Sequence, residues 1–252
     1  MQRVKYLTGL IQWGTVAHLL LSVGVPLAVW LFIRLELPIL AFAVILAGKW
    51  RMVAVAPRHW LANLRTNSPD LIVNLGFAIF LIRAETVATN LLLVALYTLW
   101  LTWLKPKSSQ TYVGVQGLAT IFIGLSALFW LSDQLNEVLI VLGGWVVALS
   151  AVRHFLSHFE EPLLRVISLG WALIVAELVW LSNRWLIIYP VAGDLVIPQV
   201  AVVVTLLAYV CGALYLLAQR ASLRRSIVRN YVIIGCTILV VIMWTSDWSI
   251  TR

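Results

Sequence analysis

The sequence predicts an all-α fold, a polytopic integral membrane helix bundle of about nine transmembrane helices. The first observation is composition, because 62% of the 252 residues are hydrophobic and 11% are charged. Soluble domains are about half apolar and about a quarter charged. The second is that apolar runs recur along the chain, many close to the roughly 20 residues that cross a hydrocarbon core. The third is that charged residues gather in the short connectors between these runs.

The expected spans belong to one transmembrane domain, residues 1–252, because the connectors are too short to hold a soluble domain. Prolines mark the first three spans. Pro26 should kink the first span, Pro38 begins the second, and Ser68-Pro69 is a typical helix start for the third. The second and third have short apolar cores, so the sequence leaves open whether they cross fully, tilt or re-enter. The nine spans are expected at 15–33, 38–56, 69–82, 87–104, 112–131, 138–152, 163–182, 198–218 and 231–244.

Tight turns or basic connectors separate the remaining six spans. The fourth runs from an Arg-Ala-Glu turn to a Lys-Pro-Lys loop. In the fifth, Gly117 and Gly124 share one helix face, which lets a neighbouring helix approach closely. The sixth begins after a short acidic turn, and the seventh begins near Pro162. The loop 183–197 leads to the eighth span, and an Arg-rich connector leads to the ninth.

The distribution of basic residues predicts the orientation. With the N-terminus in the cytoplasm and the C-terminus outside, most of the 18 Lys and Arg residues fall on the cytoplasmic side. Such a bias is the positive-inside signal of plasma (inner) membrane proteins. It also argues against a nucleic-acid partner, because the net charge of +8 is spread over several loops. The basic residues left outside are Arg34, Arg83, Arg184 and Arg252.

A repeat is visible in the spacing of the expected outer turns. These turns come at Arg34, Arg83, Asp133 and Asn183, about 50 residues apart. Each follows a similar apolar segment containing Trp or Phe. The spacing favours four tandem helical hairpins with their tips outward, followed by one terminal helix. Spans of similar length with short loops would give the same period without any duplication.

Glu177 is the acidic residue that lies well inside an apolar span. A carboxylate in a span is costly and usually faces the bundle interior, a partner or water. Arg184, Tyr189, Asp194 and Gln199 follow it and are candidate partners, so these five residues form the predicted substrate-binding set. The alternative is a structural carboxyl group that is hydrogen-bonded to Gln199 or to the loop backbone.

His154, His158 and Glu161 are weak candidates for a metal site. Their spacings of four and three would place them on one helix face. Phe155 and Phe159 lie on the opposite side, however, which favours an interfacial helix with its polar face in water. We therefore predict no metal and no cofactor.

The two cysteines, Cys211 and Cys236, lie inside apolar runs. Neither has a redox motif around it, so we expect two buried free thiols.

The function that the sequence favours is that of a non-enzymatic membrane component. Short loops and few intramembrane charges predict a protein that binds or assembles with lipid or with other membrane proteins. The alternative is a permease for a small or lipidic ligand that uses Glu177, and the third possibility is an intramembrane enzyme. No Gly-rich phosphate loop, nucleophile elbow or close Asp-rich pair is present, so no catalytic residues are predicted. A cavity would favour the permease, and a fully packed bundle would favour the scaffold.

Overall fold

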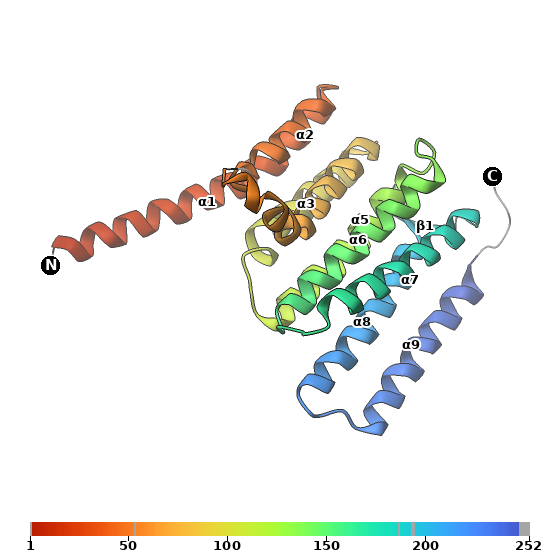
Figure 1. Cartoon of the computed structure of the whole chain (residues 1–252). Helices are drawn as coiled ribbons and strands as arrows, with labels where there is room; N and C mark the ends of the chain where they lie inside the picture. The colour runs from red at the N-terminus through yellow and green to blue at the C-terminus, as the bar shows by residue number, and fades with distance from the viewer. Residues whose placement is uncertain (1, 53, 186, 193–194, 247–252) are drawn as a thin grey trace.

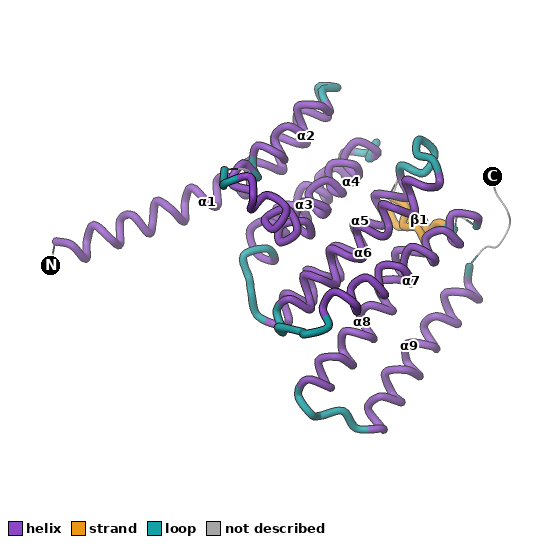
Figure 2. Tube along the Cα trace, in the orientation of Figure 1, coloured by secondary structure: helices purple, strands orange, loops and turns teal. Residues whose placement is uncertain are grey.

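The computed structural model describes residues 2–52, 54–185, 187–192 and 195–246. The described chain is all-α apart from one β-hairpin (Figures 1 and 2). Short 3-10 turns at Trp50–Met52 and Pro57–His59 lie between α2 and α3, and a π-helical turn, Trp100–Leu104, extends α4. The helices are α1 Gln2–Arg34, α2 Pro38–Ala47, α3 Trp60–Arg83, α4 Val87–Leu99, α5 Gln110–Trp130, α6 Glu137–Ser157, α7 Leu164–Arg184, α8 Gln199–Gln219 and α9 Arg225–Thr245.

Six helical segments of the described chain are long and apolar enough to cross a membrane. They are α4 with its π-helical turn, and α5 to α9. Two apolar helices are shorter, the end of α1 from Leu19 to Arg34, and α2. The second predicted span is too long, because α2 ends at Ala47 and the chain then turns.

The predicted start of the third span is also wrong. Helix α3 begins at Trp60, so Pro69 lies inside it. A proline in a helix leaves the carbonyl four residues earlier without its usual N–H donor. Here that carbonyl belongs to Arg65, and the Ser68 hydroxyl donates to it at 2.9 Å. Ser68 therefore satisfies the backbone group that Pro69 leaves free, instead of capping the helix.

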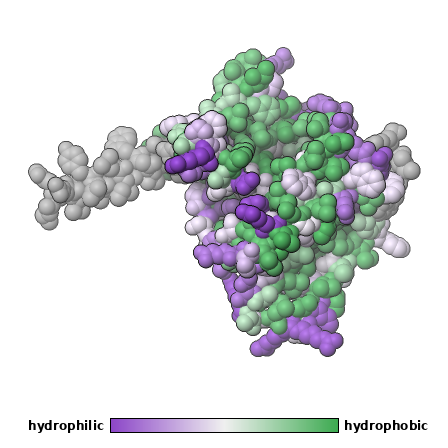
Figure 3. Space-filling view, viewed as in Figure 1, coloured by the Kyte–Doolittle hydropathy of each residue, from purple (hydrophilic) through white to green (hydrophobic). Residues whose placement is uncertain are grey.

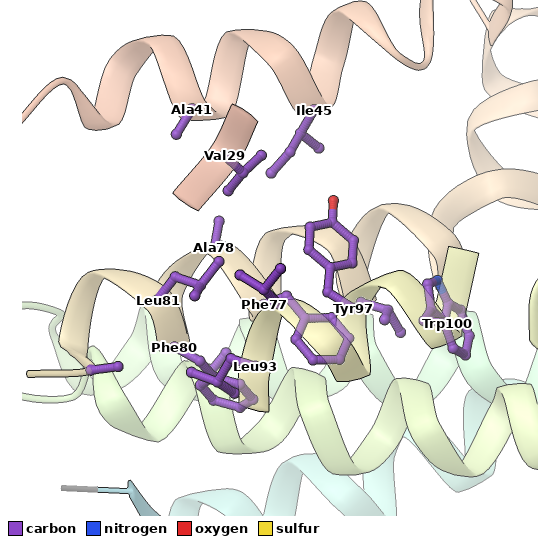
Figure 4. Packing of buried hydrophobic residues seen from close by; sticks show 14 of the residues in the cluster. Val29, Ala41, Ile45, Phe77, Ala78, Phe80, Leu81, Leu93, Tyr97 and Trp100 are labelled. Carbon is purple, nitrogen blue, oxygen red and sulfur yellow. The ribbon is translucent and has the colours of Figure 1, made fainter. Parts of the chain in front are cut away.

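The first core cluster joins α1, α2, α3 and α4 (Figure 4). Tyr97 is fully buried, and its ring stacks on that of Phe77 with the centroids 4.9 Å apart. Val29 and Ile45 close the cluster from the side of α1 and α2. Van der Waals contacts among these large apolar side chains hold α2 against the other helices.

The second core cluster joins α5, α6, α7 and α8. Glycines allow its helices to approach closely. A Cβ atom added at Gly144 would lie 2.8 Å from a Val179 methyl group, and one at Gly124 would lie 2.7 Å from Ile72. Both distances are shorter than van der Waals contact, so a larger residue at either position would require Val179 or Ile72 to shift.

The last helix is packed much less than the others. Among the described residues of α9, Gly235 is buried, and it faces Val210 of α8.

Before α8, strands β1 (Ile188–Ala192) and β2 (Leu195–Pro198) form an antiparallel hairpin. Trp130 of α5 donates through its indole nitrogen to the Val196 carbonyl at 2.9 Å. This bond ties the hairpin to the end of α5.

Candidate functional site

The bundle contains a cavity of about 410 Å³ between α5, α6, α7 and α8. Small residues create the space: Gly114 and Gly117 on α5 and Gly212 on α8. A Cβ atom at Gly114 or at Gly212 would lie 3.9 Å from the Phe155 ring, so this ring lies between the two glycines. The other lining residues are mostly apolar, among them Ile121, Ala151, Leu156, Ile167, Trp171, Ala208 and Leu216.

The cavity lies in one half of the bundle. Its lining includes the first residue of α5, Gln110, and reaches Ile121 in the middle of that helix. From α6 and α8 it takes residues of the C-terminal halves, and from α7 residues of the N-terminal half. These ends lie next to the α8–α9 connector, where Arg220 donates to the Gln110 side chain at 3.0 Å. An apolar space thus runs from a basic helix end to the middle of the bundle.

Polar side chains lie beside the cavity at the same helix ends. The Tyr215 hydroxyl donates to the Glu161 carboxylate at 2.5 Å, and the Gln219 amide donates to Tyr215 at 2.9 Å. Next to them, His154 bonds to the Gln116 side-chain oxygen at 2.8 Å. The Gln116 amide also donates to the Leu104 carbonyl at 2.7 Å and thereby fixes the end of α4 to α5.

The predicted metal candidates are not brought together. Helix α6 ends at Ser157, so His158 is its C-cap and Glu161 lies in the following turn. The shared helix face that the spacing predicted does not exist. His154 faces Gln116 and Glu161 faces Tyr215. Among the described residues, no group of three or more His, Cys, Asp or Glu side chains could hold a metal ion.

Of the three surroundings expected for Glu177, the bundle interior is not the one observed. Helix α7 buries Ala172, Val175 and Val179 against its neighbours. Glu177 is two residues beyond Val175, about 200° around the helix, and is exposed. Within the described parts of the chain, Glu177 has no hydrogen bond and no ion pair, and it does not line the cavity.

The residues predicted to accompany Glu177 lie elsewhere. Arg184 forms an ion pair with Glu137 at the start of α6, at 3.0 Å. Tyr189 and Gln199 are together: the Gln199 amide donates to the Tyr189 hydroxyl at 3.1 Å and to Ser246 at 2.6 Å. This small network joins the β-hairpin, α8 and the end of α9. Asp194 lies outside the described residues.

A buried ionic cluster forms around Asp70, which the sequence did not single out. The carboxylate pairs with Lys49, just beyond α2, and with Lys105, just beyond α4, the second at 2.9 Å. Trp100 donates to it at 3.2 Å and Asn74 at 2.9 Å. The Asp70 and Lys49 side chains are only 13% and 12% exposed.

Burial and the nearby Lys105 ammonium lower the pKa of Lys49 to about 6. Charging both lysines beside one carboxylate is therefore unfavourable near neutral pH. The sequence placed Asp70 and Lys105 at the ends of the third and fourth expected spans, but Lys49 fell inside the expected second span, 38–56. Their pairing depends on the turn after α2, which the sequence prediction extended as a helix.

The thiols are free, as expected, but both are exposed instead of buried. Cys211 lines the cavity, whereas Cys236 lies on α9. The chain therefore carries one exposed thiol that lines the cavity and another on the exposed surface of α9.

These features place the chain in the class of α-helical membrane proteins, because six helical segments of its described part are long and apolar enough to span a bilayer. No protein-family model, no curated protein and no solved structure has a significant match to it.

Proposed function

We propose that this chain is a non-enzymatic membrane component that binds a lipid in the cavity between α5 and α8. In this proposal the chain crosses the plasma (inner) membrane nine times, as four hairpins and a terminal helix, with its N-terminus in the cytoplasm. The bilayer supplies the ligand.

A cavity was expected of a permease, and it does not by itself separate the two classes; the apolar lining of this cavity is the observation that carries the lipid-binding proposal. Its 410 Å³ falls within the roughly 300–1,000 Å³ of small-molecule sites, and its lining is almost wholly apolar. An acyl chain matches that lining, because it needs no hydrogen bond. The polar part of a lipid would remain near Gln110 and Arg220, at the end of the cavity.

A permease for an apolar ligand is the second candidate, and the same cavity favours it. The cavity reaches the middle of α5, which is the depth expected of a transport site. Glu177 does not support this candidate, because its side chain lies outside the cavity.

Lipid retention tests the proposal with a matched pair of glycine variants. Gly212→Leu adds a side chain in the cavity, whereas Gly170 has nothing within 4 Å of an added Cβ atom. We expect the protein purified in mild detergent to carry bound phospholipid in native mass spectra. Gly212→Leu should lose most of it, and Gly170→Leu should keep it. Equal retention in both variants would refute a lipid site in the cavity.

The two thiols provide an independent measurement. Added phospholipid should slow the reaction of N-ethylmaleimide with Cys211 and leave the reaction with Cys236 unchanged.

A transport assay distinguishes the permease from the non-enzymatic membrane component. The protein is placed in vesicles that contain a fluorescent lipid. Transbilayer movement of that lipid, absent in Gly212→Leu, would favour the permease over the scaffold.

A further inference from the structure

The exposed face of α7 is an apolar strip with one acidic residue. Leu173 and Trp180 are 57% and 49% exposed, and they lie one turn to either side of Glu177. Gly170 and Arg184 are seven residues before and after Glu177, so the three lie nearly in line along the helix. Hydrophobic residues also cover the middle of the face of the molecule seen in Figure 3, and hydrophilic ones gather at the α8–α9 connector.

Glu177 lies too deep to reach the headgroup region. It is seven residues from Arg184 at the end of α7, a rise of about 10 Å, and a glutamate side chain extends only about half that distance. The Arg184 guanidinium is already paired with Glu137 at 3.0 Å, and it lies above the Trp180 ring at 5.8 Å. Glu177 is therefore an acid in hydrocarbon, for which the described chain supplies no donor.

A carboxylate in that position is expensive unless a donor or a cation meets it. The strip around it is suited to a helix. Gly170 has open space where a Cβ atom would be, so a second helix could approach closely two turns from Glu177. A basic side chain on such a helix would complement the acid.

We propose that this face of α7 binds a transmembrane helix of another protein, which carries a Lys or Arg at the depth of Glu177. A second copy of this chain fits the face poorly. A symmetric pair would place Glu177 against Glu177. Among the described helices, each Lys and Arg lies near a helix end, so a second copy has no cation to offer at that depth. The partner is consequently a different chain with an intramembrane cation.

The test uses the full-length protein in phosphatidylcholine vesicles with leucine-rich peptides of about 20 residues. One peptide carries a single Lys about 10 Å from the end that lies level with Arg184, and a matched peptide carries Ala there. Binding is measured by energy transfer from the tryptophans of the protein to a dye on the peptide. We expect the Lys peptide to bind about tenfold more tightly than the Ala peptide.

Variants of the strip make the test specific. Glu177→Gln should remove the preference for Lys, whereas Leu173→Gln, a polar change on the same face, should retain it. In the double variant Glu177→Leu with Leu173→Glu, the acid moves one turn, so the preferred Lys position should move by four residues. Thermal unfolding of each variant confirms that it is folded.

Two results would overturn the proposal. The first is equal binding of the Lys and Ala peptides to the folded wild type. The second is self-association of wild-type copies, measured by energy transfer between two dye-labelled populations, that Glu177→Gln abolishes. That second result would assign the face to a homodimer. Neither result depends on lipid retention in the cavity, because Glu177 does not line it.

Discussion

Asp70 and Glu177 are both acidic residues of long helices, and their surroundings differ in every respect. Asp70 is largely buried, and four side chains donate to it: Asn74 from its own helix, and Lys49, Trp100 and Lys105 from elsewhere in the chain. Glu177 is exposed on an apolar face, and the described residues give it no partner. Asp70 links its helix to the segments that carry Lys49 and Lys105. Glu177 makes no such link among the described residues, so we assign it to a helix of another protein.

The comparison teaches that depth in an apolar run and burial in the bundle are separate properties. The position of Glu177 in its run made it look interior, and the rotation of α7 turned it outward. Asp70 looked like a charge at the edge of a span. The turn after α2 and the end of α4 brought two lysines to it. Its network is fully formed without any other molecule.

The largest expected effect is that of Asp70→Asn. The neutral amide would remove the counter-charge of the Lys105 ammonium group and the carboxylate partner of Lys49, which is itself uncharged above a pH of about 6. Breaking a buried ion pair from one side costs about 3–5 kcal/mol, so the thermal unfolding midpoint in detergent should fall by several degrees. Asp133→Asn, at an exposed turn, is the control and should unfold like the wild type. An unchanged midpoint for Asp70→Asn would mean that the cluster is not holding α2 and α4.

A smaller effect concerns the pH dependence of Lys49. Its pKa is about 6 in the folded protein and 10.5 ordinarily, so between these values the unfolded chain binds a proton that the native protein does not. Stability should therefore rise as pH increases from about 6 towards 10.5, by at most about 1.4 kcal/mol per pH unit.

The measurement is the unfolding midpoint from pH 6.5 to 9 for the wild type and for Lys49→Met. The rise should be clear in the wild type and reduced in Lys49→Met, where Lys105 still neutralises Asp70. Lys107→Met, which removes an ammonium group that lies over the Trp103 and Tyr112 rings, serves as the control and should keep the wild-type slope. Parallel curves for the wild type and Lys49→Met would contradict the lowered pKa.

The smallest expected effect is that of Glu177→Leu on the isolated chain. The described residues give Glu177 no partner to lose, so the midpoint in detergent should stay within about 2 °C of the wild type. A fall as large as that of Asp70→Asn would show that Glu177 has an internal role. It would also remove the contrast on which the α7 interface rests.

The sequence by itself determined the class of fold and much of the helical pattern. Long apolar runs such as 163–182 can bury their backbone polar groups in a bilayer only as helices, so composition and length were enough. It could not determine the face that each helix presents, because a nearly uniform apolar run carries little amphipathic signal. The segment 38–56 shows the same limit at a boundary, where the helix stops at Ala47 although the apolar pattern continues.

Only the tertiary structure decided which side chains meet. Gly114, Gly117 and Gly212 line the cavity between their helices. At Gly144, in contrast, α6 packs closely against Val179 of α7. The ladder of buried residues on α7, from Ala172 to Val179, fixed its rotation and sent Glu177 outward. Such outcomes depend on contacts between helices far apart in the chain, and the order of residues within one helix does not encode them.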